Sequence, residues 1–498
     1  MAQRKSDMLE GLTFSGEKLT QDRLLAVLTS ERQRSIGLDN DNDLNRHREL
    51  ALEYYRGMVP DMPVAVDEDG KPVDTNRSKA VSTDLADAVE TIMPDLMEVF
   101  FGGEDALTFR AHGEEDVDAA EQETDYVRQI VFHSNDGFSN AYEWFKESLL
   151  CRTGIAKWWW DDDEEFEEYE GEANLAELQE MQEMGIELVD AEPCAPESDE
   201  EYAQGLEPPR YKYEARKLVR PATVNWMAVP SSDFGVAPET GRLKDAPYAV
   251  MRSRPQKQEL IAQGHDPETV RSLSMGDEDD DGGVDEARET SDEDDDATES
   301  MGDLARCEIH EHYIRADFEG AGRPQIWRII TGNAEKVLLD IEKRAAIEFA
   351  ALCPFPMMFQ FYGQDLADKV MPWQRINSAL LRNGLDNNSF QLNARMEVAD
   401  DRSTENTLDD LQNNEPGHPI RVKSAGAISP VRLAALSVNP FETIEQMKTM
   451  SEQSSGIIRG AQGLNPDSLH KTKGGMQIQQ SAAQKRARMM ARLYAETG

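Results

Sequence analysis

The sequence predicts an α+β protein: a mixed α/β body, then a long helical hairpin with a small α/β insert between its two helices. Apolar residues recur at the helical period over residues 363–393. The polar, proline-containing segment that follows, 396–436, cannot continue that helix. Upstream, strand patterns are mixed with helical ones, which favours a body with both kinds of structure. These strand patterns span residues 211–229, 247–253, 306–316 and 325–339.

The part of the chain before these strands is predicted to be mainly helical. Residues 1–60 carry apolar residues at helical spacing, and further helices are expected at 78–100 and 138–151. Segment 161–205 is rich in carboxylates and has few apolar residues. Within it, an exposed helix is expected around residues 175–184.

The first hairpin helix is assigned to residues 363–395. At about 1.5 Å per residue, some 30 residues would span about 45 Å. One set of apolar side chains repeats at helical spacing and is expected to pack this helix against its neighbours. The set consists of Leu366, Val370, Trp373, Ile376 and Leu380.

The second hairpin helix is assigned to residues 438–461. Asn439 is placed to cap it, Pro440 to occupy its first turn and Glu442 its third position. Three small residues on this helix would allow a close approach to the first. They are Ser451, Ser454 and Ser455.

The net charge constrains which partners the chain can bind. With 52 basic and 97 acidic residues, the formal charge is −45. Broad, tight wrapping of nucleic acid is excluded, because DNA is itself a dense polyanion. A protein that surrounds DNA without gripping it remains compatible, since a weakly repulsive wall lets a polyanion slide. The charge would also keep a concentrated assembly in solution.

The cysteines and the apolar runs indicate a protein made in a reducing cytoplasm, without a membrane span. The four cysteines lie far apart and form no Cys-x-x-Cys pair. The first residues lack the apolar core of a signal peptide, and no run approaches the roughly 20 apolar residues of a membrane helix.

Two patterns resemble parts of metal sites. Asp277, Asp279 and Asp281 match the first half of an EF-hand loop, but its twelfth position, which should be a bidentate Glu, is Arg288. A solvated acidic loop at 277–303 is therefore expected.

The second pattern is Glu308, His310 and His312, which would share one face of a strand. They could form half of a metal site, or they could be polar residues on a solvent face. No further ligand can be named from the sequence.

A third pattern, the run Trp158, Trp159 and Trp160, allows two interpretations. It could stack on bases, or alternate tryptophans could be buried in the body. Three aspartates follow at once, which favours burial. Neither a phosphate-binding P-loop nor a Gly-x-Ser-x-Gly motif is present, so no catalytic residue, resident metal or cofactor is predicted.

In several segments the chain resembles the portal proteins of tailed bacteriophages, of the short-tailed type. The resemblance lies in the order and spacing of these segments, not in a catalytic signature. They include RELALEYYRG, GQDLADKVMPWQRINSALLRNGLDNNSF, LNPDSLHKT and AAQKRARMMARLYAETG, at residues 48–57, 363–390, 464–472 and 482–498, together with residues 76–109.

The resemblance implies a division of the chain into portal domains. The wing would be residues 1–362, with acidic insertions at about 161–205 and 277–303. The stem helices would be 363–395 and 438–461, and the clip between them 396–437. A tunnel loop at 462–475 and a wing helix at 476–498 would follow, leading toward a crown beyond the chain end.

The resemblance also implies a function without catalytic activity. Twelve copies would form a ring at one capsid vertex of the virion, and double-stranded DNA would pass through it without sequence-specific contacts. Expected partners are the terminase large subunit, tail adaptor proteins, and the major capsid and scaffolding proteins. His470, Lys471 and Lys473, on the tunnel loop, would lie near the DNA.

Two alternatives remain open at this point. One is an acidic metal-dependent hydrolase using Glu308, His310 and His312. The other is an acidic scaffold or adaptor protein that forms no ring. The basic cluster on the last helix (Lys485, Arg486, Arg488 and Arg492) is expected to make ion pairs between subunits.

Overall fold

The computed structural model confirms an α+β protein, with both helices and sheets. The residues it describes are 9, 11–14, 16–38, 42–62, 77–102, 108–111, 113, 116–162, 164–193, 210–220, 222–274, 302–392, 396–413, 417–431, 439–455 and 488–496. The chain divides into two compact units. Unit 1 comprises residues 1–106, 142–155 and 229–498, and unit 2 comprises 107–141 and 156–228.

Unit 1 is built on an antiparallel sheet of five strands in the order β12-β11-β10-β9-β8. Along β9, alternate residues enter different cores: Val250 faces one core, and Ala249 and Met251 face another. This is the period-two alternation expected of a sheet covered on both faces. The strands are β8 Phe234–Val236, β9 Tyr248–Ser253, β10 Ile309–Ala316, β11 Gln325–Gly332 and β12 Val337–Arg344.

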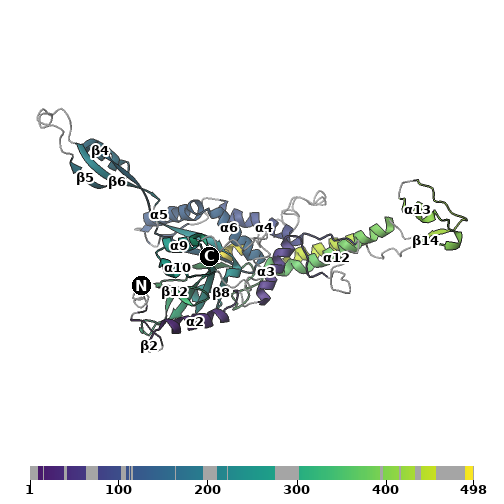
Figure 1. The fold of residues 1–498 in the computed structure, drawn as a ribbon, viewed down its shortest axis with the longest axis horizontal. Helices are drawn as coiled ribbons and strands as arrows, with labels where there is room; N and C mark the ends of the chain where they lie inside the picture. Colours follow the sequence, from purple (N-terminus) through teal and green to yellow (C-terminus); the bar gives the residue numbers. More distant parts are fainter. Residues whose placement is uncertain are drawn as a thin grey trace. The chain divides into compact units, whose positions relative to one another are not determined.

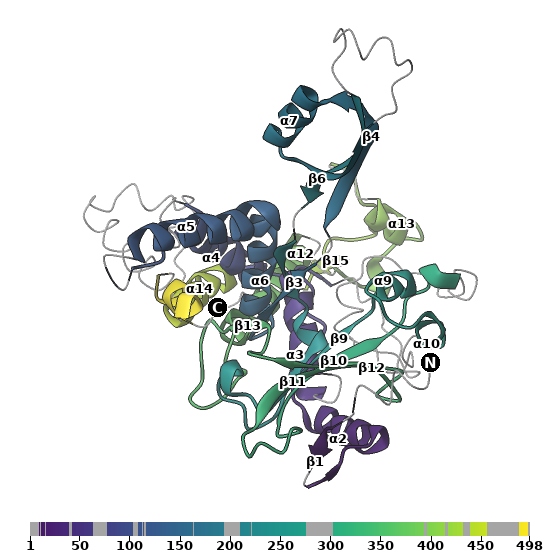
Figure 2. The ribbon, with the colours of Figure 1, turned by 90° about the vertical axis from the view of Figure 1, so that its left-hand side faces the viewer.

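The first core lies between this sheet and helix α2 (Gln21–Arg34), as Figure 2 shows. Leu24 and Leu28 of α2 pack with Val250 and Ile329 of the sheet. A short hairpin, β1 (Thr13–Phe14) and β2 (Glu17–Lys18), precedes α2. The prediction that residues 1–60 are largely helical is therefore confirmed for α2 and α3 (Asn42–Tyr55), but it missed this hairpin.

The second core covers the opposite face of the sheet. Its aromatic side chains interlock, with the rings of Phe234 and Phe349 5.0 Å apart and those of Tyr313 and Phe349 5.4 Å apart. A smaller cluster packs around Leu260, Val270 and Leu273 near the sheet edge. Phe349 belongs to β13 (Phe349–Leu352), Leu260 to α9 (Lys257–Ala262) and Val270 to α10 (Pro267–Arg271), and Leu273 follows α10.

The helical part of unit 1 is dominated by one long helix, α12 (Leu366–Leu392). It contacts α3, α4 (Asp84–Phe101) and α14 (Pro440–Ser455). Helix α4 begins later than the predicted residue 78, and residues 77–83 before it form no helix. Helix α6 (Gly137–Leu150) agrees with the predicted 138–151.

A small α/β module lies at the C-terminal end of α12 (Figure 1). Strands β14 (Met396–Val398) and β15 (Ile428–Pro430) pair antiparallel, and α13 (Thr407–Gln412) lies between them in sequence. Nε and Nη2 of Arg421 donate hydrogen bonds to the two carboxylate oxygens of Asp410, at 2.9 and 2.7 Å. This holds the pKa of Asp410 well below its usual range. The module is therefore stabilised by an internal ion pair, Asp410 with Arg421, in place of a large apolar core.

Unit 2 contains a second antiparallel sheet, in the order β4-β6-β5. The central strand carries basic residues between two acidic strands; Arg216, for example, lies 2.8 Å from Glu187. Helix α7 (Leu175–Glu183) confirms the helix expected around 175–184, but the acidic segment also forms strands that were not predicted. The elements of this unit are α5 Val117–Arg128, β3 Gly154–Asp161, β4 Glu165–Asn174, β5 Ile186–Pro193, β6 Arg210–Arg220 and β7 Thr223–Val229; β3 begins in unit 1.

Among the described residues, no helix is long and apolar enough to cross a membrane.

Candidate functional site at the base of the long helix

Helix α12 begins with two aspartates that cap each other's backbone. The amide of Asp368 donates to Oδ1 of Asp365 at 2.6 Å, and the amide of Asp365 donates to Oδ2 of Asp368 at 3.3 Å. This reciprocal arrangement is a capping box with Asp in place of the usual Glu. It satisfies amides at the helix start and places negative charge at the positive end of the helix dipole.

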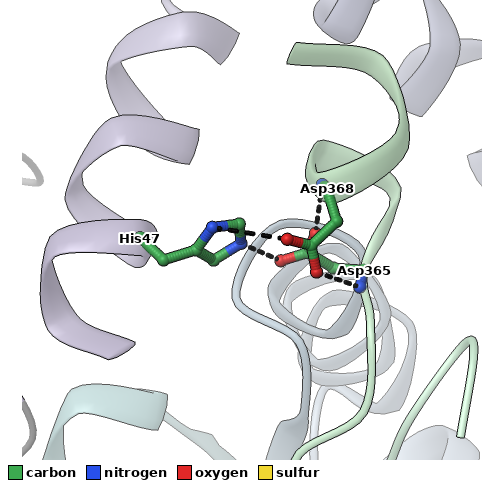
Figure 3. Close-up of side chains that lie close together, drawn as sticks. All are labelled: His47, Asp365 and Asp368. Atoms are coloured by element: carbon green, nitrogen blue, oxygen red, sulfur yellow. Dashed lines mark hydrogen bonds and ion pairs between the residues drawn. The ribbon is translucent and has the colours of Figure 1, made fainter. Parts of the chain in front are cut away.

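His47 of α3 joins this cap to the rest of unit 1, as Figure 3 shows. Its Nε2 lies 2.8 Å from Oδ2 of Asp365, and its Nδ1 lies 3.6 Å from Oδ1 of Asp368. Asp365 is fully buried, and burial raises the pKa of its carboxyl group, an effect that His47 partly offsets. Arg152 contacts the other carboxylate, with its Nη2 3.2 Å from Oδ1 of Asp368.

The donor atoms of His47, Asp365 and Asp368 are close enough to hold a metal ion, all within 4.8 Å of one another. Three features of the site oppose a cation there. The two ring nitrogens of His47 face different carboxylates, Arg152 already supplies a positive charge, and the N-terminus of α12 adds a partial positive charge. We therefore interpret the cluster as an ion-pair joint between α3 and α12.

A polar ladder fastens α12 to residues 77–85, a segment that we call the strap. The amides of Ser78, Ser82 and Leu85 donate to side chains of α12, at 2.6, 3.0 and 2.9 Å. The carbonyl of Ala80 accepts from Nε of an arginine of α12 at 2.9 Å. The partners on α12 are spaced four residues apart and form one stripe of the helix. They are Gln374, Ser378, Arg382 and Asp386.

Helix α14 lies along α12. The two helices meet at Gly384, where an added Cβ would lie at van der Waals distance, 3.4 Å, from Cζ of Phe441. The Asn439 side chain caps α14 by accepting from the Phe441 amide at 3.1 Å. The predicted cap is thus present, and α12 and α14 form a helical hairpin.

A family model described as phage SU10 portal protein matches residues 24–498. The chain belongs to this family of phage portal proteins. The resemblance to portal proteins of the short-tailed phage type is therefore confirmed. The comparison with curated proteins gives no match. Portal proteins are structural components of capsid-associated oligomeric assemblies.

The apolar residues predicted to pack the portal stem have unequal burial. Leu366 and Val370 are fully buried, Trp373 and Leu380 are half-buried, and Ile376 is 43 % exposed. On α14, Ser451 is buried and Ser454 is exposed, whereas the side chain of Ser455 lies outside the described part. The buried stripe of α12 is in large part polar, because the strap contributes backbone groups to it.

The residues predicted to approach DNA (His470, Lys471 and Lys473) lie outside the residues that the structure describes, as does the acidic stretch 275–301. The last portal helix is described over residues 488–496. Tyr494 is buried there, hydrogen-bonds Ser148 and packs its ring 5.4 Å from that of Phe145. Arg492 lies 3.4 Å from Glu496 of the same helix.

The interpretation of Glu308, His310 and His312 as polar residues on a solvent face is wrong. Both histidines are buried in the sheet of unit 1. The ring nitrogens of His312 lie 2.7 Å from the Tyr248 hydroxyl and 2.9 Å from Oγ1 of Thr331. A catalytic metal site must keep a position open to substrate. The hydrolase alternative is not supported, because these rings are enclosed.

A buried glutamate completes this cluster. Glu335 lies in a left-handed turn, with φ of 55°, 49° and 60° at residues 333–335. Its Oε1 is 3.2 Å from Nδ1 of His310 and 3.0 Å from Nε of Arg32 on α2. Burial lowers the pKa of His310 and lowers that of His312 to about 3. Burial also raises the pKa of Glu335, although Arg32 opposes that shift.

The tryptophans of β3 show less burial than expected. Trp159 is half-buried, whereas Trp158 and Trp160 are 42 % and 52 % exposed. The rings alternate across the strand, but only Trp159 is substantially covered within the described chain. Lys157, the basic residue next to this run in the sequence, has its Nζ 6.0 Å from the centre of the Trp159 ring, a cation–π contact within the same strand.

Proposed function

We propose that this chain is the ring-forming subunit of the portal at one capsid vertex, with twelve copies around an axial channel. The α12–α14 hairpin is the stem, and the module from β14 to β15 is the clip. Membership of the portal family supports the structural role and the oligomeric assembly. The division into wing, stem and clip rests on the order of these elements in unit 1.

The single observation that carries the proposal is the way α12 is held. Its 27 residues would span about 40 Å. The capping box fixes its start to the body, the strap holds it from Gln374 to Asp386, and α14 lies along it. Only its far end carries the small module. A helix rooted in this way is suited to line a channel while presenting a separate tip.

Double-stranded DNA is the proposed cargo of the channel, during both packaging and ejection. The net charge of −45 disfavours tight binding and is compatible with sliding. The segment 462–475 is proposed to project toward the DNA, with Lys471 and Lys473 making contacts to phosphates that carry no sequence information.

The clip is the proposed docking site for the terminase large subunit and, later, for tail adaptor proteins. The body would contact the major capsid and scaffolding proteins. Replacing residues 396–437 with a short turn should abolish terminase and adaptor binding. The body should still fold, because the module is stabilised by its own ion pair, Asp410 with Arg421. Unchanged binding would move the docking site elsewhere.

The proposed ring can be tested on the purified chain. Native mass measurement across a dilution series and negative-stain images should show closed rings with a central hole. A monomer or dimer at micromolar concentration would contradict the proposal, as would open filaments.

A further inference from the structure

A short loop just before the stem helix exposes three consecutive apolar side chains. Met357, Met358 and Phe359 are 44 %, 84 % and 95 % exposed in the chain. Scattered single apolar residues are normal on a protein surface, but a contiguous run of large ones marks an interaction site. We call residues 356–360 the apolar loop.

The base of the apolar loop is fixed on both sides. The amide of Gln364 donates to the carbonyl of Phe355 at 3.0 Å, which closes the loop. Gly363 is packed so tightly that a Cβ there would lie 2.5 Å from Sγ of Cys353. Phe361 and Tyr362, directly after the loop, are buried in the second core of unit 1. The exposed side chains therefore stand on a rigid base.

The backbone at the tip is also held in an uncommon conformation. Phe359 has φ of 61°, a region that bulky residues rarely adopt and that costs free energy unless the surroundings impose it. The amide of Gln360 donates to the carbonyl of Met357 at 3.4 Å within the turn. A strained backbone that displays a phenylalanine to solvent indicates a contact made in the assembled state.

The chemistry of the loop narrows the choice of partner. Its sequence, PMMFQ, contains no charged side chain that could bind phosphate, so DNA is disfavoured. An anionic lipid surface is disfavoured by the net charge of −45. Aromatic residues and methionine are enriched where protein surfaces bury each other. A protein partner fits best.

We propose that Met358 and Phe359 of each subunit pack against the neighbouring copy of this chain, as a knob in a contact that is repeated around the ring. This inference rests on the proposed ring. In a head-to-tail ring, each copy offers one surface to the next copy and a different surface to the previous one. One preformed knob per chain supplies such a contact at every interface, and its rigidity reduces the entropy lost on association.

The test is a double substitution, Met358→Ser with Phe359→Asn, in the full chain. Asparagine tolerates the left-handed backbone better than phenylalanine does, so the monomer should fold and melt as before. We expect the concentration for half-assembly, measured by native mass measurement, to rise at least tenfold. The control is Leu175→Ser with Met184→Ser, two residues of unit 2 that are 58 % and 62 % exposed, and it should assemble like wild type.

A second measurement does not depend on disrupting the loop. A photo-crosslinking benzoylphenylalanine at position 359 should join two copies in assembled rings, which a denaturing gel shows as a doubled chain mass. If the double variant assembles normally, and rings with benzoylphenylalanine at position 359 give no chain-to-chain crosslink, the knob is overturned and the proposed ring stands. A wild-type chain that forms no rings and no crosslinks would overturn both.

Discussion

Gln374 of α12 joins three segments through one buried side chain. Its Oε1 accepts from the Leu85 amide at 2.9 Å, and its Nε2 donates to the carbonyl of Tyr54 at 3.0 Å. The side chain has no solvent exposure, so water cannot replace either bond. The end of α3, the start of α4 and α12 are thus held together by one side-chain amide.

Gln374→Leu should destabilise the protein by about 2 kcal/mol, because it leaves the Leu85 amide without this partner and removes one of two hydrogen bonds to the Tyr54 carbonyl, which also accepts from the Gly57 amide at 3.1 Å. Urea unfolding monitored by circular dichroism would measure the loss. Asn383→Leu is the matched control, since it replaces an exposed amide of the same helix and should change the free energy of unfolding by less than about 0.5 kcal/mol. Equal effects of the two substitutions would mean that the buried amide bonds contribute nothing measurable.

His47→Leu should also destabilise the protein by about 3 kcal/mol, because it leaves the buried Asp365 carboxylate without its side-chain partner. Adding Asp365→Asn should recover part of the loss, since asparagine is neutral and still caps a helix. Thermal melting of the single and double variants measures both effects. A rise in melting temperature of wild type, but not of His47→Leu, at micromolar Zn²⁺ or Mn²⁺ would instead indicate a metal site.

Stability should fall as the pH drops below about 6.5, the ordinary pKa of histidine. His312 has a folded-state pKa of about 3, so the unfolded chain binds more protons than the folded chain between pH 3 and 6.5. The stabilisation is complete above the unfolded pKa and decreases by up to about 1.4 kcal/mol per pH unit in that window. His310, whose pKa is lowered in the same direction, adds to the slope.

His312→Gln should therefore flatten the dependence of unfolding free energy on pH, whatever it does to stability at pH 7.5. The measurement is urea unfolding at pH 5.0, 6.0 and 7.5. The exposed residue His133, changed to Gln, serves as the control and should leave the slope unchanged. An unaltered slope in the His312 variant would show that other groups control acid unfolding.

Changing Lys471 and Lys473 together to Glu should leave ring assembly intact and reduce genome content per particle. Each lost phosphate contact removes a contribution from counterion release, and the loss should not depend on DNA sequence. Quantifying packaged DNA in phage that carry the double substitution tests this. Full particles with normal DNA retention would assign these lysines to another role.

The helical hairpin was predictable because its signals are local. Leu366 and Val370 repeat at helical spacing, and Asn439 precedes Pro440 in a recognisable cap. The cap at the start of α12 has a local signal as well, since Asp365 and Asp368 stand three residues apart, but the pattern does not match the usual capping box because Asp replaces Glu.

The strap and the histidine cluster could not be predicted by the same reasoning. Helical periodicity places the polar residues Gln374 and Ser378 on a solvent face. They are buried because they bond to backbone groups almost 300 residues earlier in the chain, which periodicity does not reveal. From their pattern alone, His310 and His312 resemble exposed strand residues. The contact of His310 with Glu335 depends on the fold, which brings the turn at residues 333–335 beside the strand. Burial of polar side chains depends on tertiary partners, which a single sequence does not reveal.

The strap has a mechanical consequence for α12 in its proposed role as a channel wall. Its hydrogen bonds follow one another along the axis of α12, from Leu85 with Gln374 to Ser78 with Asp386. A force along that axis strains all of them at once, in shear, whereas a sideways force would peel them one at a time. An apolar stripe would resist sliding only weakly, because apolar contacts are not directional. If α12 lines the proposed channel, the polar ladder would fix the axial position of the helix against the moving DNA.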